Sequence, residues 1–583
     1  MKGRKCAIPT LVDGNRKVTD DIEKASLLNR TFASKFVDPQ VTVYPQTVDY
    51  PIDSLTTFNV CPDTVKAVLE SVNRHKACGP DNISARIIRE CADELTAPVT
   101  LICKLSLEQG VVPQIWKRAN IVPIFKKGLK TCPANYRSVS LLPLLSKVLE
   151  RVVYNSLFNH VQSVLSTGQH GFLPGRSCAS NLGTMLHSAW NNVSAGSQTD
   201  VIYTDFSSAF QSVKHKLLIQ KLKNSFHIAD KALSWCESYL AGREQRVIVN
   251  GQCSPWTPVT SGTPEGSLLS PLFFALYIND LPGAVHADCV MFADDVKLYR
   301  RVDQSKDTAL LQADLDRLHC WSKSWGLTLN PVKCKVLTLS LRRSPVIGRY
   351  SIDGTAIERV SAMRDLGVLL DEKLTFGPHI DSIVLKANTS LGLLMRSFQT
   401  GKNGRSLRDL SCRDQKAIVS TYCANVRSVL EYCSVIWGGA AEVHMKRVER
   451  IQHKFLMWLC GRCRLSGVSL EYVELLRYFG LTSLAARRAQ HDLMFMRNIQ
   501  NQSADSSFLL GCFPLAVPVR ALRTRTLFHV PYARVGTVKS GMFCRLPRTS
   551  NAFLDKCRDV DVWEFSAGQY KRSVRAYVTT AGV

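Results

Sequence analysis

The sequence predicts an α+β fold with more than one domain, and three features carry that prediction. β-branched and aromatic runs on both sides of Asp294 and Asp295 predict a strand, a tight turn and a second strand over residues 290–299. Apolar residues at helical spacing predict amphipathic helices from residue 62 onward. Beyond about residue 373 the sequence is mainly helical and basic. At 583 residues, the chain is long enough for several sizeable cores.

The chain is strongly basic. Lys and Arg number 74 against 48 Asp and Glu, a formal net charge of +26. Such an excess favours a polyanionic partner, with nucleic acid ahead of an anionic membrane surface. No apolar run is long enough to span a bilayer, and the N-terminal stretch M-K-G-R-K-C-A-I-P-T-L-V-D-G lacks the apolar core of a signal peptide. We therefore expect an intracellular protein, in the nucleus or the cytoplasm, with no membrane partner.

The 20 cysteines are scattered through apolar stretches, so we expect reduced and mostly buried thiols. One C-x-x-C, formed by Cys460 and Cys463, follows His453. These thiols either end a helix or bind zinc, and no second ligand pair at zinc-finger spacing supports the zinc site.

The N-terminal part begins with residues 1–60, which we interpret as a linker-like segment with one helix near residues 20–36 and no evident chemistry. A capped helix is predicted from residue 62, and the Gly79-Pro80-Asp81 turn precedes another. The stretches at 111–128 and 135–151 suggest two strands with cations at their ends.

Three of these cations, Lys126, Lys127 and Arg137, flank a Gly-containing loop. A strand pair could project them at a phosphate chain, because Lys supplies a mobile point charge and Arg a planar fork. The alternative is ordinary solvated surface charge.

The middle of the chain alternates strands and helices. A Gly- and Pro-rich stretch precedes a predicted helix at 178–195. Asp205 ends an apolar strand just before a helix, a position suited to binding a ligand. Residues 244–260 predict a strand pair with a turn at Asn250-Gly251. A turn rich in Gly, Pro and Ser then leads into an apolar helix, which we expect to pack under the sheet that carries the acids.

Asp294 and Asp295 stand at the tip of the predicted hairpin. Two carboxylates held this close repel each other unless a cation lies between them. Mg²⁺ suits the position because it takes oxygen ligands and leaves coordination sites open for substrate phosphates. A plain solvated turn is the alternative, and one short motif does not decide between them.

Several further motifs occur in a defined order. They comprise an acid at a strand end followed by an aromatic, a P-x-G-S turn before an apolar helix, and the F-A-D-D hairpin, together with G-P-D-N-I, N-Y-R-S-V-S-L-L, Q-H-G-F-L-P-G-R-S, L-N-P-V-K-C-K and D-L-G-V-L-L. In this order the chain resembles the reverse transcriptases of non-long-terminal-repeat (non-LTR, LINE-type) retrotransposons, most closely their jockey and CR1-like branches. The resemblance covers nearly the whole chain, so chance matches in an unrelated protein are negligible.

The resemblance implies a right-hand polymerase, with fingers and an antiparallel-sheet palm over residues 61–372. Residues 373–583 would form the thumb and a mainly helical, basic C-terminal region. The implied activity is RNA-directed DNA polymerisation, in which the 3′-hydroxyl of a primer is extended with deoxynucleotides. The implied partners are an RNA template, a DNA primer and dNTPs, with an element-encoded RNA-binding protein as a further candidate.

Residue by residue, the resemblance implies that Asp205, Asp294 and Asp295 are catalytic and hold two Mg²⁺ ions, with Mn²⁺ as an alternative. The implied nucleotide-binding residues are Lys126 and Arg137 for the triphosphate, Phe210 beneath the sugar, Glu265 and Gly266 in the turn beside the incoming nucleotide, and Lys333. Lys333 would protonate pyrophosphate; an exposed strand lysine is the alternative. The stretch from residue 365 resembles the hairpin that supports the primer end.

Three positions depart from the family pattern, which usually has Gln where Glu265 stands, Asp where Gln211 stands and Pro where Ser138 stands. An ionised Glu only accepts hydrogen bonds and adds negative charge beside a triphosphate. Full-length elements also carry an endonuclease before the polymerase, and residues 1–60 resemble only the joining segment. Two hypotheses follow: an active reverse transcriptase, or a truncated and decayed copy that binds nucleic acid without catalysis.

Overall fold

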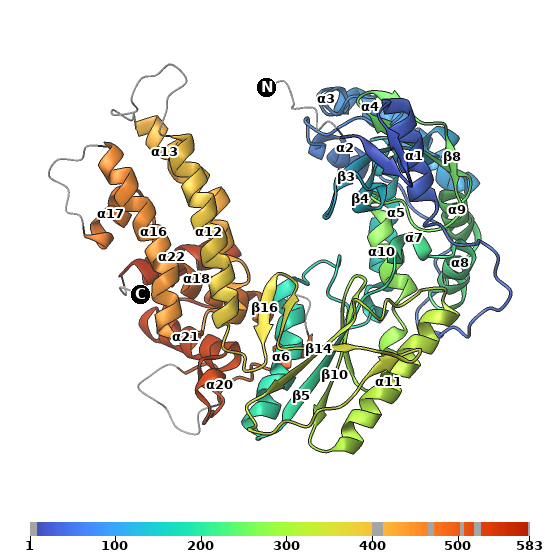
Figure 1. Ribbon diagram of the computed structural model, residues 1–583. Coiled ribbons are helices and arrows are strands. Elements are labelled where there is room, and N and C mark those ends of the chain that lie inside the picture. Colours follow the sequence, from blue (N-terminus) through green and yellow to red (C-terminus); the bar gives the residue numbers. More distant parts are fainter. Residues whose placement is uncertain (1–7, 399–411, 464–470, 502–506, 518–525, 581–583) are drawn as a thin grey trace. The chain divides into compact units, whose positions relative to one another are not determined.

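The computed structural model describes residues 8–398, 412–463, 471–501, 507–517 and 526–580 (Figure 1). Residues 1–7, which begin the stretch considered above for a signal peptide, lie outside the described residues. Helices and strands are both abundant, in agreement with the predicted α+β class. The chain forms two compact units. The first comprises the described residues of Met1–Phe172, Thr204–Val296 and Ala313–Lys333, and the second those of Leu173–Tyr203, Lys297–Gln312 and Cys334–Val583.

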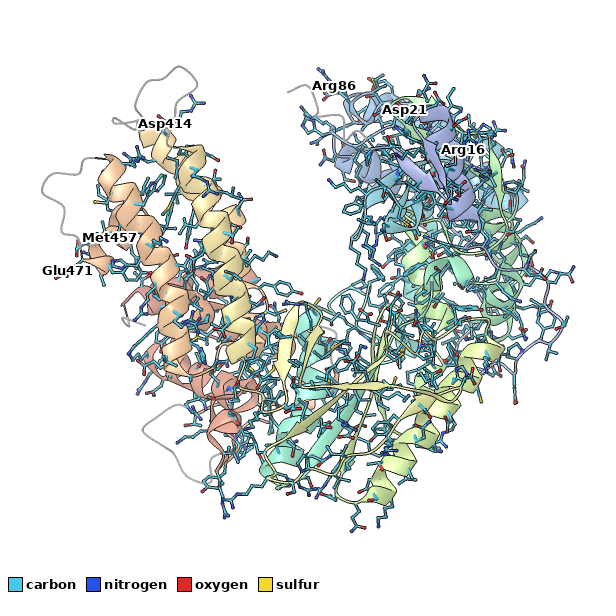
Figure 2. The ribbon with its side chains drawn as sticks, viewed as in Figure 1. Arg16, Asp21, Arg86, Asp414, Met457 and Glu471 are labelled. Atoms are coloured by element: carbon cyan, nitrogen blue, oxygen red, sulfur yellow. The ribbon has the colours of Figure 1, made fainter. Side chains whose placement is uncertain are left out.

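The first unit opens with a short hairpin and helix α1 (Asp21–Ala33), within the range predicted for a helix. The hairpin pairs β1 (Leu11–Asp13) with β2 (Arg16–Val18) in antiparallel fashion. Asp20 caps α1, because its carboxylate accepts hydrogen bonds from the first free backbone N–H groups of the helix. Asp21, labelled in Figure 2, lies in the first turn of α1. Its carboxylate accepts a hydrogen bond from Asn250 Nδ2 at 2.9 Å. That contact ties the start of α1 to the predicted Asn-Gly turn.

Helix α1 packs on a sheet whose strand order is β4-β3-β6-β7, with β8 also paired to β6. Their bounds are β3 (Arg118–Phe125), β4 (Tyr136–Leu141), β6 (Arg243–Val249), β7 (Gln252–Cys253) and β8 (Thr257–Val259). The shared core contains Leu28 and Phe32 from the helix and Ile121 and Val247 from the sheet. Both predicted strand regions are therefore present.

The second predicted strand is shorter than expected, because it ends at Leu141 and helix α5 (Ser146–Val161) follows. Val148, Leu149 and Val152 are buried on one face of that helix. The stretch after the strand thus buries its apolar residues at the helical period of 3–4, which the sequence interpretation at 135–151 overlooked.

Helix α10 (Leu269–Tyr277) is apolar and packs against α5, and its Phe273, Phe274 and Tyr277 are fully buried. The first unit contains further helices. They are α2 (Pro62–Ser71), α3 (Ala85–Glu90), α4 (Ala92–Gln109), α7 (Ala209–Ser212), α8 (His215–Asn224) and α9 (Asp230–Leu240); α11 (Ser305–Ser324) contributes its second half. Lys221 of α8 is buried, 3.5 Å from the ring centre of Trp325 and 2.7 Å from Asp280 Oδ1. Burial lowers the pKa of Lys221 to about 8, although the carboxylate partner opposes the shift.

The second unit contains most of a sheet in the order β14-β11-β5-β10, in which β11 is antiparallel to β5 and parallel to β14. The bounds are β5 (Gln198–Thr204), β10 (Asp295–Val302), β11 (Lys335–Ser340) and β14 (Glu358–Val360). Asp200 of β5 is fully buried and accepts hydrogen bonds from Tyr350 Oη at 2.8 Å and Thr338 Oγ1 at 2.9 Å. This network satisfies the buried carboxylate and joins the chain after β11 to the sheet.

The predicted helix at 178–195 is α6 (Cys178–Ser194), and the predicted hairpin from residue 365 pairs β15 (Ala362–Asp365) with β16 (Val368–Asp371). Beyond it the described chain is mainly helical, as expected, and α12 lies beside α16 (Figure 1). The remaining elements are β12 (Ser351–Ile352), β13 (Thr355–Ala356), α12 (Gly377–Ser397), α13 (Cys412–Tyr422), α14 (Ser428–Glu431), α15 (Ser434–Trp437), α16 (Glu442–Cys463), α17 (Tyr472–Tyr478), α18 (Leu484–Gln500), α19 (Ser507–Gly511), α20 (Gly536–Ser540), α21 (Met542–Lys556) and α22 (Ala567–Thr580).

Cys460 and Cys463 lie in the last turn of α16, so the C-x-x-C ends a helix. The side chains of 18 of the 20 cysteines are described, all as free thiols. The expectation that most would be buried is wrong, because only five of these 18 are: Cys103, Cys236, Cys334, Cys460 and Cys544. Helices within the described ranges are all too short or too polar to cross a membrane.

Replacement of Leu28 by Ala should lower the free energy of unfolding by about 2–5 kcal/mol, because it removes buried atoms and leaves a cavity between α1 and the sheet. Ile22→Ala on the same helix is the matched control, since Ile22 is 49% exposed and should cost no more than about 0.5 kcal/mol. Urea unfolding followed by circular dichroism measures both. If Leu28→Ala lowered the free energy of unfolding no more than Ile22→Ala does, Leu28 would not contribute to this core.

Candidate active site

Asp294 lies in the turn between β9 (Asp288–Phe292) and β10. Ala293, just before it, has a φ of +56°, a left-handed conformation that non-glycine residues seldom adopt. Burial raises the pKa of the Asp294 carboxyl, and the nearby carboxylate of Asp205 raises it further. Asp295 follows as the exposed first residue of β10. The predicted strand, turn and strand are therefore confirmed, with the two acids at the tip.

Asp205 follows the end of β5, as the sequence predicted. Thr204 Oγ1 donates a hydrogen bond to the carbonyl oxygen of Val296 at 3.0 Å, which holds the end of β5 against the start of β10. Lys333 Nζ lies 3.0 Å from Asp205 Oδ2. The acid at the strand end and the acid in the hairpin are thus brought together, with Lys333 beside one of them.

Lys126 and Arg137 lie on the paired strands β3 and β4 and the loop between them. Partial burial lowers the pKa of Lys126, and the neighbouring charges of Arg137 and Lys333 lower it further, whereas Asp205 opposes the shift. Both cations also act on Asp294, whose raised pKa they partly offset. The predicted cations and acids therefore share one electrostatic environment.

Phe210 lies half-buried five residues after Asp205. Its ring stacks on Phe274 of α10, with 4.4 Å between ring centres and 22° between planes. The ring of Phe172 meets it edge-on at 6.1 Å. The carbonyl oxygen of Phe210 accepts a hydrogen bond from Thr263 N, so the aromatic and the predicted nucleotide turn are directly connected.

The Glu265 carboxylate accepts hydrogen bonds from Gln211 and Ser138, the other two residues that depart from the family pattern. Gln211 Nε2 donates a hydrogen bond to Glu265 Oε1, and Ser138 Oγ donates to Oε2 at 3.3 Å. Burial raises the pKa of the Glu265 carboxyl, while the hydrogen bond from Ser138 and the charges of Lys35 and Arg137 oppose that shift. The family usually has Asp at 211 and Gln at 265. In this chain the amide is at position 211 and the carboxylate at position 265, the reverse of that arrangement, and the two side chains are hydrogen-bonded to each other.

Backbone contacts hold the turn that contains Glu265 and Gly266. A Cβ atom at Gly266, where φ is +92°, would lie 2.9 Å from the carbonyl oxygen of Ser140. Lys147 Nζ donates to the carbonyl oxygen of Gly266 at 3.0 Å. Ser261 Oγ donates to the carbonyl oxygen of Gln211 at 2.7 Å and accepts from Val37 N at 2.9 Å. The turn therefore requires glycine at position 266 and is joined to the segment after α1.

Two contributors escaped the sequence interpretation. Lys35 and Ser261 lie 230 and 4 positions from Glu265 in the chain, and residues 1–60 showed no chemistry of their own. Ser261 belongs to the predicted turn but was given no role of its own, and no motif marks Lys35. Only the packing of α1 on the sheet brings Lys35 to the acid.

Asp205 and Asp294 offer neighbouring carboxylate oxygens, a donor set that fits Mg²⁺. Within the described ranges, no three His, Cys, Asp or Glu side chains lie close enough together to hold a metal ion. The participation of Asp295 as a third ligand therefore stays a prediction.

Residues 124–370 match the family model described as "Reverse transcriptase (RNA-dependent DNA polymerase)". They form a reverse transcriptase domain. Every site residue predicted from the sequence lies inside this span. The electrostatic cluster of acids and cations described above is thus a feature of the reverse transcriptase domain itself.

The chain is also similar to proteins of mobile elements from Drosophila melanogaster. It is 28% identical over 423 residues to the "RNA-directed DNA polymerase from mobile element jockey". This match covers 70% of this chain and 44% of that protein. It is 27% identical over 469 residues to the "Probable RNA-directed DNA polymerase from transposon BS", covering 77% and 50%. The match to the corresponding X-element protein is 28% over 423 residues, covering 71% and 45%. The chain spans about half the length of these curated relatives.

The contact between Gln211 and Glu265 predicts coupled substitutions. Gln211→Asp should destabilise the chain, because it places a second carboxylate against Glu265, and Glu265→Gln should restore stability in that background. We expect a coupling free energy of about 0.5–3 kcal/mol in a double-mutant cycle measured by urea unfolding. Additive effects would mean that the two side chains do not interact.

The same cycle should depend on pH in a defined direction. Because burial raises the pKa of Glu265 above its ordinary value of 4.5, the neutral carboxyl is the form that the fold tolerates best. The loss of unfolding free energy caused by Gln211→Asp should be small below pH 4.5. It should grow as the pH rises through the raised pKa of Glu265. Gln252→Asp, on an exposed residue of β7, is the control and should show no such trend.

Proposed function

We propose that the chain is an RNA-directed DNA polymerase of a non-LTR retrotransposon, which extends the 3′-hydroxyl of a primer with dNTPs on an RNA template. One observation carries the proposal: Asp205 and Asp294 approach each other beside Lys126, Arg137 and Lys333 in a reverse transcriptase domain. Neighbouring acids facing cations suit a reaction in which a metal-bound triphosphate is cleaved. The names of the mobile-element relatives support the same activity.

Asp205 and Asp294 would hold Mg²⁺, with Mn²⁺ as a substitute and Asp295 in support. When bound, the ions would make the primer hydroxyl a better nucleophile and neutralise charge on the leaving pyrophosphate. Lys126 and Arg137 would bind the triphosphate oxygens and orient the α-phosphorus for attack. Lys333 would donate a proton to the pyrophosphate, and its place beside Asp205 supports that role.

Phe210 would lie beneath the sugar of the incoming nucleotide, where its bulk excludes a 2′-hydroxyl. Its support on Phe274 leaves the ring little freedom to retreat. Glu265 and Gly266 would lie beside the same nucleotide. The hydrogen bonds that Gln211 and Ser138 donate to Glu265 offset part of its negative charge and favour an active enzyme over a decayed copy.

We further infer the right-hand subdivision, with fingers and palm at 61–372 and the thumb and basic C-terminal region at 373–583, preceded by the segment 1–60. The net charge of +26 suits binding to an RNA template and a DNA primer. An element-encoded RNA-binding protein would be a further partner, and the nucleus or the cytoplasm the site of action.

Asp294→Asn should reduce extension of a DNA primer on an RNA template by roughly a thousandfold or more, because it removes a charged metal ligand. EDTA should abolish extension by the parent chain, and added Mg²⁺ should restore it. Asp13→Asn is the matched control, since Asp13 is an exposed acid on β1. Nucleic-acid binding without any extension by the parent chain would instead support the decayed copy.

Phe210→Val should admit ribonucleotides. Loss of the ring beneath the sugar should raise the ratio of ribonucleotide to deoxynucleotide incorporation by about tenfold or more. The kcat/KM values for dCTP and CTP on one primer and template measure this ratio. An unchanged ratio would mean that another residue excludes the 2′-hydroxyl.

A further inference from the structure

The segment Gly168–Phe172 runs beside β9 in the first unit. Met291 N donates to the carbonyl oxygen of Gly168 at 2.8 Å, and His170 N donates to the carbonyl oxygen of Met291 at 2.8 Å. The two stretches therefore pair as a short parallel bridge. The pairing ends two residues before Ala293, where the chain turns toward Asp294.

Beyond the backbone pairing, the side chain of Gln169 contacts the turn after β9. Gln169 is only 1% exposed, and its Oε1 accepts hydrogen bonds from Gly171 N at 2.7 Å and from Ala293 N at 3.0 Å. Ala293 is the left-handed residue that directly precedes Asp294. One amide oxygen thus satisfies the backbone donor at the point where the chain direction changes.

Close packing leaves this segment no room to shift. A Cβ atom at Gly171 would lie 2.3 Å from Ala293 N, and one at Gly168 would lie 2.7 Å from the carbonyl oxygen of Cys289. Both distances are far below van der Waals contact, so glycine is required at these two positions. The segment therefore packs closely against β9 and its turn.

The next residue extends the same segment to the proposed sugar site. Phe172 has a φ of +61°, and its ring meets Phe210 edge-on at 6.1 Å. A stretch of five residues thus contacts both the turn that carries Asp294 and the aromatic proposed to lie beneath the sugar.

We propose that Gln169 is a positioning residue that fixes the direction of the Asp294 carboxylate through Ala293 N–H, with Gly171 providing the close approach. This inference rests on the proposed polymerase function. A left-handed alanine is an unfavourable conformation, so an acceptor for its N–H is needed to keep the turn in one arrangement. The carbonyl end of an amide supplies that acceptor without adding a negative charge beside two acids.

The test compares Gln169→Leu, Gly171→Ala and the control Gln162→Leu, which alters an exposed glutamine at the end of α5. Hydrogen exchange of full-length chains, read on a peptide spanning 290–296, should rise about tenfold or more in the first two variants and stay unchanged in the control. Single-turnover extension of a DNA primer on an RNA template should slow about 10- to 100-fold in the same two variants, because a small displacement of a reacting group is costly. Binding of the primer and template should change less than about threefold, which shows that each variant is folded.

Faster exchange together with slower chemistry supports the inference. Unchanged exchange in Gln169→Leu, or faster exchange with an unaltered extension rate, would overturn it. If the parent chain binds the primer and template but does not extend it, the proposed function fails. The exchange measurement would then still report whether Gln169 holds the turn, so the two failures are distinguishable.

Discussion

The close approach of two carboxylates, Asp205 and Asp294, is the constraint on which the rest of the reverse transcriptase domain depends. Neighbouring like charges oppose folding unless opposite charges offset them. Lys333 contacts Asp205, and Lys126 and Arg137 act on Asp294. The left-handed conformation of Ala293 adds a cost of about 1–2 kcal/mol, which the surrounding hydrogen bonds must also offset. The neighbouring carboxylates and the strained turn therefore both reduce stability at the proposed active site.

The residues proposed to bind the nucleotide are also held in place by neighbouring groups. Phe210 is supported from below by Phe274, and the neighbouring turn is held by Ser140, Lys147 and Ser261 through backbone atoms. These contacts do not involve the side chain of Glu265, whose carboxylate is instead hydrogen-bonded by Gln211 and Ser138. A substitution such as Glu265 can therefore change the charge of the pocket without changing the path of the chain.

Features encoded by neighbouring residues could be predicted from the sequence. The Asn250-Gly251 turn, the hairpin at Asp294 and the helix after Asp20 each follow from local patterns of turn, cap and apolar residues. The hydrogen bond between Gln169 and Ala293 and the electrostatic interaction between Lys35 and Glu265 could not be predicted, because they join positions 124 and 230 residues apart. At 146–151 the pattern was ambiguous, since a short apolar run suits a strand or a helix, and tertiary packing selected the helix.

The contact between Gln211 and Glu265 also restricts how such a pair can arise in a lineage. From the arrangement usual in the family, Asp at 211 with Gln at 265, two single changes lead to this chain. Changing position 265 first would set two carboxylates against each other, whereas changing position 211 first would give two amides that can still share a hydrogen bond. The contact therefore makes one historical order of substitution much more accessible than the other.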